Sequence, residues 1–493
     1  MRWLVAIAAI YLYVFPYFPR IHSANELPRV YLVQSVAHEH RFAIDTGVGR
    51  WGATADVSPA GGHEYSNKAP GSSFLVVPVY AIVRALAGEP SLATSFWLCR
   101  AIGGIVPTLI FLWLLYGFLA RWAPDPAVRR LVLVAYGLGS MALTYSILFY
   151  SHQLGAVCVG SAWILATDVA DEKRTWRAML AAGALAGAAP LVDYQAIFAA
   201  VPVAIWFVAR VRQRPELVRM LAATAAGAVV PIAVLLLYHR ACFGSPWRTG
   251  YDASTTFAMY HQQGFLGITA LRGEAFVGSL LRPDNGLFAL SPWWLLAFPG
   301  FALLWRRGER GVAAVGASVL VIYVLFVSSI NFWRGGWQVG PRYIVAMLPF
   351  LLPPIAAQLQ AWRTKPYAFG AACGLVVAGA AIYVGSAATF PYWPDSVVNP
   401  VAHLMFPMIA EGRAAPNVLS ALGAPDALAL AVYFAGAAAL LGFVIARAGG
   451  RRALLVAAAL GAVVVAAFCL YARGSAAADE HHLRSVYAHS LDS

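Results

Sequence analysis

Long apolar runs alternate with short polar gaps along almost the whole chain. A helix needs about 20 predominantly apolar residues to cross a bilayer, and runs of roughly that length recur throughout the sequence. The pattern predicts an all-α polytopic membrane protein with about thirteen transmembrane helices. The expected spans are residues 3–19, 94–119, 131–149, 154–170, 178–194, 196–211, 220–238, 287–305, 311–330, 342–361, 367–387, 426–446 and 453–472.

One further apolar segment, GSSFLVVPVYAIVRALAG at residues 71–88, needs a separate interpretation. Counting it as a span would invert the charge pattern of every gap that follows. We therefore expect an interfacial or re-entrant helix inside a long polar connection, residues 20–93.

The polar gaps fall into two kinds. Short gaps carry clusters of Lys and Arg, whereas longer and more aromatic connections lie at 20–93, 239–286, 331–342 and 388–425, followed by the tail 473–493. Cytoplasmic loops of membrane proteins carry the excess of Lys and Arg. The chain is therefore expected to have a cytoplasmic N-terminus, a periplasmic C-terminus and its large connections outside.

Composition supports this reading. The chain is 60% hydrophobic, has a mean hydropathy of +0.68 and carries only 12% charged residues, against about 25% in soluble proteins. A net charge of +13 could suggest nucleic acid. We exclude that partner because the basic residues sit in short gaps between spans, so the charge is a topology signal.

The five cysteines indicate neither a disulfide framework nor a metal cluster, because no two of them are close in sequence and most lie in apolar runs. The N-terminal stretch has no clear small-x-small cleavage site, so we expect an uncleaved first span. We find no internal repeat, and the Ala, Leu, Val and Gly-rich segment 425–472 is expected to be structural.

Candidate chemistry concentrates at the outer ends of the expected spans. Four short stretches carry it: Asn25-Glu26 with Arg29, residues 66–73 with Lys68, FYSHQL with His152, and WRGGWQVGPRY with Arg334, Arg342 and Tyr343. Each has a structural alternative. Glu26 and Arg29 could anchor the interface, Lys68 could snorkel, the tryptophans could form an aromatic belt, and His152 could be a core histidine.

Taken together, these residues suit one reaction. A carboxylate at the membrane surface can act as a general base toward a hydroxyl. Lys and Arg can hold a phosphate leaving group, and neighbouring glycines allow backbone N–H groups to approach it. The set therefore favours attack of an acceptor hydroxyl on a sugar whose leaving group is a lipid phosphate.

The same stretches resemble the GT-C glycosyltransferases that use polyprenyl-phosphate sugars, in particular the bacterial aminoarabinose transferases and protein O-mannosyltransferase-like enzymes. In that family an Asp-Glu motif follows the first span, and Asn25-Glu26-Leu27-Pro28-Arg29 matches it except at Asn25. A Lys-Pro-Pro motif opens a juxtamembrane helix, and Asn67-Lys68-Ala69-Pro70 matches it except at Ala69. YHRACFGSPWRTGY, GLFALSPWWLL and WRGGWQVGPRYIVAMLPFLLP look like later blocks, so the resemblance covers roughly residues 1–360.

The resemblance implies a helical bundle with a periplasmic cavity capped by juxtamembrane helices, and an inverting, direct-displacement transfer. It makes Glu26 the base, with Asp45 in reserve, and Lys68 and Arg342 the phosphate ligands. The weaker substrate-binding candidates are Arg29, Arg334 and Tyr343, and His152 is a polar contact or a second base. Residues 1–361 form the expected catalytic module, and 362–493 the C-terminal transmembrane region.

Two departures affect the cofactor. Asn25 removes one carboxylate, and His152 stands about where relatives carry a second acid. Both count against a divalent-metal site, which stays an open alternative, and no other cofactor is assigned. The expected partners are a polyprenyl-phosphate sugar donor, a glycan, lipid or protein acceptor, and the bilayer of a bacterial inner membrane.

A different class of function, a transporter or flippase of lipid-linked sugars, is also compatible with a polytopic chain that is basic inside. It predicts ionisable residues near the middle of the bilayer. Here the mid-span charges are few, with Arg100 the main one and Asp193 near a span end. Charge gathered at one face favours an enzyme with a one-sided active site.

Overall fold

The computed structural model describes residues 2–21, 23–471 and 486. The chain is an all-α polytopic membrane protein whose one small β-sheet, among these residues, is the hairpin of β1 (Val57–Ala60) and β2 (His63–Ser66). The hairpin is antiparallel and pairs Val57 with Ser66. The tail 473–493, and with it the predicted periplasmic C-terminus, lies outside the described residues apart from Val486.

Helices of the first half build the outer segment and most of the bundle. They are α1 (Arg2–Tyr13), α2 (Leu27–Gln34), η1 (Ser35–Glu39), α3 (Asp45–Trp51), α4 (Gly71–Ala87), α5 (Leu92–Arg100), η2 (Ala101–Ile105), α6 (Val106–Phe118), η3 (Leu119–Arg121), α7 (Pro126–Leu138), α8 (Met141–Ile147), α9 (His152–Ala170), α10 (Ala178–Val192), η4 (Tyr194–Ala196), α11 (Ile197–Val211) and α12 (Leu217–Phe243).

The second half adds a short outer segment, a further set of long helices and a C-terminal pair. These elements are η5 (Gly250–Ala253), α13 (Ala258–His261), α14 (Gly273–Leu280), α15 (Leu287–Leu290), η6 (Pro292–Leu296), α16 (Ala297–Arg306), α17 (Arg310–Ser329), η7 (Arg342–Leu351), α18 (Leu352–Trp362), α19 (Pro366–Ala388), η8 (Val401–Met405), α20 (Phe406–Ala410), α21 (Val418–Ala421) and α22 (Asp426–Leu470).

Eight helices of the described residues are long and apolar enough to cross a membrane, or nine if the bent pair α7–α8 counts as one span. The predicted spans 3–19 and 178–194 fold as shorter helices, α1 and α10. The predicted span 287–305 is divided among α15, η6 and α16, and the last two predicted spans are joined within α22 across a kink at Gly450, φ 78°. By length and composition alone, the structure therefore supports fewer spans than the thirteen that the sequence predicts.

The breaks have local causes. α1 ends at Tyr13, shortly before Pro16, and a proline disfavours helical geometry in the residue before it. Ser291 precedes Pro292 and likewise leaves helical geometry, with φ −138° and ψ 71°. Its hydroxyl and the Trp293 indole N–H both donate to the carbonyl of Gly139, at 2.7 and 2.8 Å. Gly139 lies at the 57° bend of α7–α8, so side chains at one helix break satisfy a backbone carbonyl at the other inside the bundle, as a lipid environment requires.

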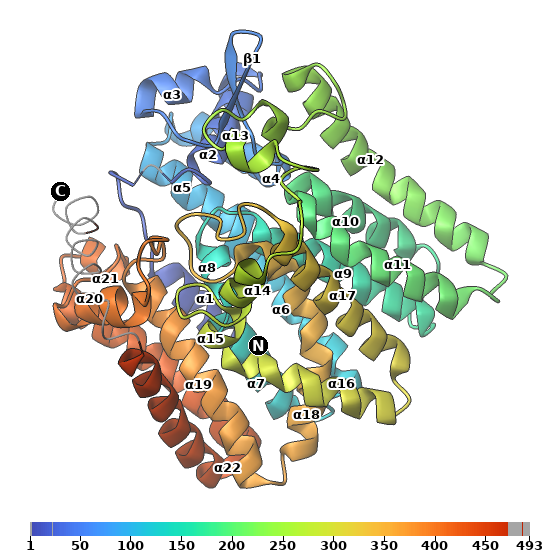
Figure 1. The fold of residues 1–493 in the computed structure, drawn as a ribbon, viewed down its shortest axis with the longest axis vertical. Helices are drawn as coiled ribbons and strands as arrows, with labels where there is room; N and C mark the ends of the chain where they lie inside the picture. The colour runs from blue at the N-terminus through green and yellow to red at the C-terminus, as the bar shows by residue number, and fades with distance from the viewer. Residues whose placement is uncertain (1, 22, 472–485, 487–493) are drawn as a thin grey trace.

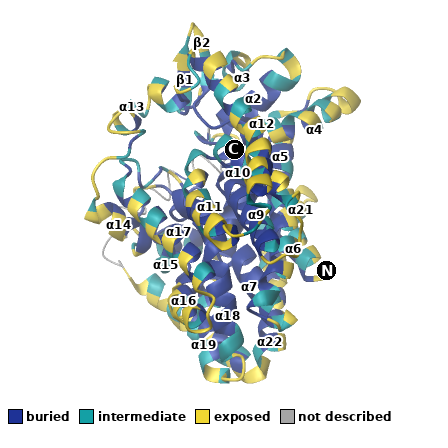
Figure 2. Cartoon of the chain, turned by 90° about the vertical axis from the view of Figure 1, so that its right-hand side faces the viewer, coloured by how far each residue is buried: buried dark blue, intermediate teal, exposed yellow. Residues whose placement is uncertain are grey.

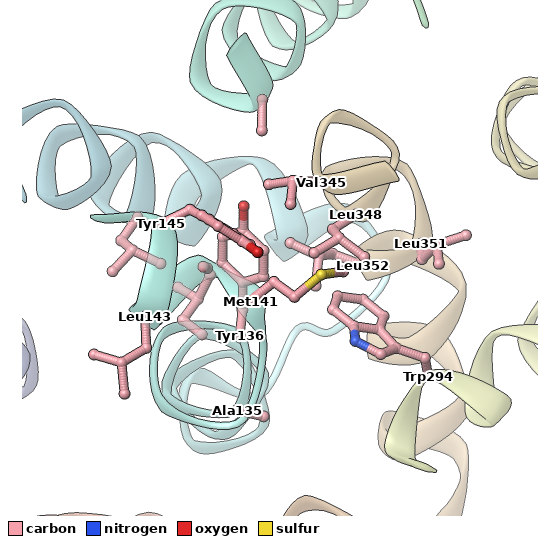
Figure 3. Packing of buried hydrophobic residues seen from close by; sticks show 14 of the residues in the cluster. Ala135, Tyr136, Met141, Leu143, Tyr145, Trp294, Val345, Leu348, Leu351 and Leu352 are labelled. Carbon is pink, nitrogen blue, oxygen red and sulfur yellow. The ribbon is translucent and has the colours of Figure 1, made fainter. Parts of the chain in front are cut away.

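The core lies where these broken helices meet. Figure 3 shows Tyr136 and Met141 of the α7–α8 pair facing Leu348 and Leu352 of η7–α18, with Trp294 closing one side. Figure 2 shows the buried residues filling the bundle around α7, α9, α18 and α19, whereas exposed residues cover α11, α12 and α16. Exposed Val and Leu side chains on α11 and α12 are those expected to face lipid.

The basic gaps that the sequence predicts to be cytoplasmic gather at one end of the molecule. The contacts that join them are Arg121 with Asp171 at 3.3 Å, Arg214 with the carbonyl of Ala170 at 2.6 Å, Arg363 with Asp125 at 2.8 Å, and Arg363 with the carbonyl of Ala448 at 3.3 Å. The connections 20–93 and 239–286 carry α3, β1 and α13 at the opposite, upper end of Figure 1.

The predicted boundary between residues 361 and 362 falls at the C-terminal end of α18, just before the connection to α19, and stays a prediction. α19 and α22 pack along each other, and α22 also contacts α7 and α1 of the preceding region. The connection between α19 and η8 leaves this pair and reaches the outer end of the bundle, where it contacts Glu26 and Arg100.

Candidate active site

A cavity of about 610 Å³, here called the main cavity, opens among the outer connections. Its wall combines charged, amide and aromatic side chains from six separate parts of the chain. The polar and phenolic groups that bear on chemistry are Asn25, Asp56, Tyr150, Arg342, Tyr392 and Asp395. The cavity therefore gathers the outer connections at the place where the sequence predicts an active site.

Arg342, the first residue of η7, is buried and lines the main cavity. Its guanidinium lies over the rings of Tyr150 and Tyr343, 5.5 and 5.2 Å from the centroids, and Nη2 donates to the Tyr343 hydroxyl at 3.4 Å. Nε has no hydrogen-bond partner, and no carboxylate oxygen of the described residues lies within 4.0 Å of the guanidinium. A buried cation without a carboxylate is costly unless an anion joins it.

Two glycines form part of the same wall. Gly335 and Gly336 have φ of 75° and 77°, in the left-handed region that favours glycine. A Cβ on Gly335 would lie 3.0 Å from Arg342 Nε and 2.7 Å from the Gln338 side-chain oxygen. The WRGGW stretch is thus a glycine turn, as its structural interpretation holds, and the turn brings the backbone against the Arg342 side chain.

Lys68 lies beside the main cavity, in a buried ion pair with Asp56 at 2.8 Å. Asn67 donates from its side chain to the same carboxylate at 3.2 Å, and Asp56 itself lines the cavity. Burial lowers the pKa of Lys68 to about 8; Asp56 opposes this shift, whereas Arg342 adds to it. Lys68 and Arg342 are therefore close enough to repel, although they are far apart in sequence.

Glu26 stands in a different environment. Its side chain is fully buried, with 0% exposure, and does not line the main cavity. Arg100 donates to both carboxylate oxygens, Nε at 2.9 Å and Nη2 at 3.0 Å. The Tyr392 hydroxyl and the Phe149 N–H donate to them as well, at 2.6 and 2.7 Å. Because the carboxylate accepts four hydrogen bonds and is paired with a guanidinium, this geometry favours a structural anchor over a proton acceptor.

Arg29 ties the start of α2 to the start of α4. It donates from Nη1 to the carbonyl of Ala69 at 3.1 Å and to the Ser72 hydroxyl at 3.2 Å, and from Nε to the Asn25 amide oxygen at 3.3 Å. Burial lowers the pKa of the Arg29 guanidinium, which nearby phenols and carboxylates oppose. Its polar capacity is largely used within the protein, and it does not line the main cavity.

His152, the first residue of α9, is paired with Asp193, whose Oδ2 lies 2.8 Å from the imidazole Nδ1. Both side chains are buried. Nε2 has no hydrogen-bond partner, and the rings of Tyr150 and Tyr343 contact the imidazole edge to face. The pair stands immediately behind the main cavity, so His152 has a polar partner, as the core-histidine interpretation expects, and is also near the predicted site.

The remaining predicted residues are distributed around the main cavity. Arg334 pairs with buried Asp284 at 3.1 Å and lines a second, adjoining cavity. Tyr343 lines a smaller apolar cavity of about 180 Å³ on the other side of Arg342. Asp45 lies apart, in a partly exposed pair with His63 at 2.9 Å. Burial would raise the pKa of Asp45, but the Glu64 N–H and His63 outweigh it, so this pKa is lowered.

No metal-binding constellation is found in the part of the chain that the structure describes, because no three His, Cys, Asp or Glu side chains gather there. Of the two carboxylates that line the main cavity, Asp56 is paired with Lys68, and Asp395 has no ion pair among the described residues. The residues present therefore do not form the ligand set that a divalent metal would need.

Several groups at the site are not among the predicted site residues. The sequence assigns no role to Asp56 of the connection 20–93, to Tyr150 of the FYSHQL stretch or to Asp193 near a span end. Tyr392 and Asp395 come from the connection 388–425 in the sequence FPYWPD, beyond the part that carries the resemblance. The only local signal there is its aromatic and proline-rich character, which resembles WRGGW.

No family model matches the chain, and no curated protein matches it in sequence. Solved structures do match its fold. ArnT from Cupriavidus metallidurans in the apo state is 15% identical, covers 97% of this chain and 75% of its own, and superposes with a TM-score of 0.52. ArnT bound to undecaprenyl phosphate is 15% identical, covers 99% and 76%, and has a TM-score of 0.50.

The oligosaccharyltransferase of Archaeoglobus fulgidus in the apo form is a more distant match, 13% identical, covering 93% of this chain and 55% of its own with a TM-score of 0.47. The two ArnT structures show the fold. The chain has the fold of these ArnT structures, as the sequence resemblance predicts, with helices α2, α3 and α4 at the upper end of Figure 1.

Proposed function

We propose that this chain is a membrane glycosyltransferase that moves a sugar from a polyprenyl-phosphate donor to an acceptor hydroxyl. Its GT-C architecture supports an enzyme of this general kind. The neighbour of the same fold that holds undecaprenyl phosphate supports a lipid-phosphate donor. Which sugar is transferred, and to which acceptor, is not specified by either.

The observation that carries the proposal is the unpaired cation on the cavity wall. Arg342 is buried without a carboxylate partner among the described residues, and Lys68 lies close to it with Asp56 as its single carboxylate. Of the two carboxylates that line the main cavity, only Asp56 pairs with one of these cations, so the charge of Arg342 stays unpaired. A phosphate bound there would supply the missing negative charge, and a guanidinium can hold it with two parallel hydrogen bonds.

This arrangement fits an inverting, direct displacement. The acceptor oxygen attacks the anomeric carbon, the bond from that carbon to the phosphate oxygen breaks, and the electron pair leaves with the lipid phosphate. Arg342 and Lys68 stabilise the charge that develops on the leaving group, which is the main way a protein accelerates such a step. The lipid tail keeps the phosphate at membrane depth, where both cations lie.

The base remains a separate question. That Glu26 accepts the proton stays a prediction, but its carboxylate already accepts four hydrogen bonds, and it does not line the main cavity. Asp45, the reserve candidate, does not line that cavity either. The geometry therefore favours a different group for proton transfer and an anchoring role for Glu26.

We place this reaction at the periplasmic face of the bacterial inner membrane. The basic gaps gather at the end opposite the main cavity, and Lys and Arg favour the cytoplasmic side. Accessible-cysteine labelling in intact cells tests this orientation. A cysteine in place of Pro59, an exposed residue of β1, should react from outside. One in place of Thr175, exposed in the basic gap between α9 and α10, should not.

Purified protein in nanodiscs, given labelled polyprenyl-phosphate hexose or pentose, tests the activity itself. We expect release of polyprenyl phosphate with sugar transferred to an added acceptor. The alternative, a flippase, predicts exchange of the labelled lipid between leaflets of proteoliposomes without product. The burial of Arg100 in a closed pair with Glu26 counts against that alternative, because the main mid-span charge is then not part of a pathway.

A further inference from the structure

A second cavity of about 460 Å³, here called the side cavity, adjoins the main cavity. The two share three lining residues, Tyr260, Phe332 and Asp395. The rings of Tyr260 and Phe332 are stacked, with centroids 4.7 Å apart. One wall therefore separates the two spaces, and it consists of an aromatic pair and a carboxylate.

The side cavity has a lining that suits a sugar. Glu274, Asn331 and Arg282 offer hydrogen-bonding groups beside the Tyr260–Phe332 pair. Aromatic faces with a few placed polar groups are typical of sites for small polar ligands. The lining also contains a buried structural element, because Arg282 and Arg334 both contact Asp284, at 3.0 and 3.1 Å.

The carboxylates of the two cavities differ in how far they are committed. Asp56 lines the main cavity but is paired with Lys68. Glu274 lines the side cavity only. Asp395 is exposed and lines both cavities. No cation of the described residues lies within 4.0 Å of its carboxylate. It is therefore the carboxylate that an acceptor in one cavity and a donor in the other could both approach.

The segment that carries Asp395 is held on three sides. The Tyr392 hydroxyl bonds to Glu26 at 2.6 Å and accepts from Arg100 at 2.7 Å. The carbonyl of Trp393 accepts from the Gln338 N–H at 3.1 Å, and that of Pro394 accepts from Arg334 at 3.4 Å. A catalytic group must be held within a fraction of an ångström by its supporting contacts. The Glu26–Arg100–Tyr392 cluster supplies such support three residues before Asp395.

We infer that Asp395 is the general base and that the side cavity holds a carbohydrate acceptor; this inference rests on the proposed function. The acceptor hydroxyl oxygen forms the new bond to the anomeric carbon as the bond to the phosphate oxygen breaks. The hydroxyl proton passes to the Asp395 carboxylate, and the electron pair of the broken bond leaves on the lipid phosphate. Glu26, Arg100 and Tyr392 are positioning residues in this scheme.

The test compares wild type with Asp395→Asn in nanodiscs, supplied with labelled undecaprenyl-phosphate sugars and n-octyl glycosides as acceptors. Release of undecaprenyl phosphate reports transfer to any acceptor, water included. Asp395→Asn should lower kcat by about 10²–10⁴, while the Kd for undecaprenyl phosphate stays within about twofold, since no phosphate contact is removed. Glu274→Ala should instead raise the KM for the glycoside and leave kcat nearly unchanged.

Glu411→Gln is the matched control, since Glu411 is an exposed carboxylate of the same connection and pairs with Arg413 at 3.0 Å. It should behave as wild type. An active wild type with an equally active Asp395→Asn would overturn the inference and leave the proposed function standing. A wild type that binds undecaprenyl phosphate but releases none from any donor would overturn both. Transfer that ignores glycosides in favour of peptides or lipids would overturn the carbohydrate acceptor.

Discussion

Two buried ion pairs lie near each other at the outer end of the bundle, and they differ in what surrounds them. In the Glu26–Arg100 pair the guanidinium donates to both carboxylate oxygens, and the Phe149 N–H and the Tyr392 hydroxyl donate to them as well. Neither side chain of the pair lines the main cavity. In Asp56–Lys68 a single contact of 2.8 Å joins the two charges, Asp56 faces the main cavity, and Arg342 stands nearby without a carboxylate among the described residues.

The difference separates two uses of a buried charge. A buried carboxylate whose capacity is fully used holds the fold in one geometry, and removing its partner is costly. A buried cation that lacks a carboxylate partner and lies beside a cavity is a candidate for binding an anionic ligand. Burial of an ionisable residue therefore does not by itself mark the active site of this chain. We propose that unpaired charge facing a cavity marks it instead.

The strongest challenge to this comparison is Arg100→Met, which leaves Glu26 buried without its cation. Breaking a buried pair in this way typically costs about 3–5 kcal/mol of folding free energy. We expect a large drop in melting temperature in detergent, and the double variant Glu26→Gln/Arg100→Met should regain part of the loss because no unpaired charge remains. An unchanged melting temperature for Arg100→Met would remove the structural role.

Glu26→Gln and Tyr392→Phe separate an anchor from a base at the same cluster. If Glu26 is the base, Glu26→Gln lowers the rate by about 10²–10⁴, and Tyr392→Phe has a much smaller effect. If the cluster positions Asp395, both variants lower kcat together and both lower the melting temperature. Steady-state kinetics beside thermal unfolding distinguish the two outcomes, and we expect the second.

On the open side of the comparison, Lys68→Ala and Arg342→Ala should weaken binding of undecaprenyl phosphate. Losing a hydrogen bond to a charged group costs about 1.5–3 kcal/mol, or roughly 10–150-fold in Kd. Arg342→Ala should not lower stability as Arg100→Met does, because Arg342 has no carboxylate to leave unpaired in the part of the chain that the structure describes. Lys68→Ala should also lower the melting temperature, because it leaves the buried Asp56 carboxylate without its cation. Lys365→Ala, an exposed cation at the opposite end, is the control. Equal Kd values for all three variants and wild type would contradict the phosphate assignment.

The lowered pKa of Lys68 makes the open site sensitive to pH. The ammonium of the free protein loses its proton as the pH rises through about 8, so the Kd for undecaprenyl phosphate should rise above that pH by up to about tenfold per unit. Lys68→Arg should be free of this rise, because Arg keeps its charge to beyond pH 12 or so. The contribution of Lys68 to folding stability should instead increase with pH over this range. Between about pH 8 and 10 the unfolded chain holds the proton that the folded chain has lost, and stability rises with pH wherever the unfolded state binds more protons.

The smallest expected effect is that of Asp45→Asn, which removes a partly exposed pair far from the main cavity. Such pairs contribute about 0–1 kcal/mol, and Asp45 is 34% exposed in its pair with His63. We expect activity within about twofold of wild type, as for other surface substitutions away from a site. A loss as large as that of Asp395→Asn would restore Asp45 as a candidate base.

Part of the candidate site could be predicted from residue types alone. Lys68 and Arg342 stand beside glycine or proline at the outer ends of apolar segments, and the structure brings both to the margin of one cavity. Arg334 and Tyr343 follow in the same stretch but line other cavities. The sequence predicts that these side chains can bind substrate. The direction in which each one points depends on the bend of the backbone around Gly335 and Gly336.

The sequence by itself determined that this chain is a helical membrane protein, because apolar runs of about twenty residues can satisfy their backbone in lipid as helices. Only the tertiary structure decided which charged side chains are paired within the protein. Arg100 meets Glu26 across 74 residues, and Tyr392 meets it across 366. No local pattern encodes such partners, because they depend on how broken helices pack. That packing closes one buried carboxylate and leaves Arg342 and Asp395 facing open space.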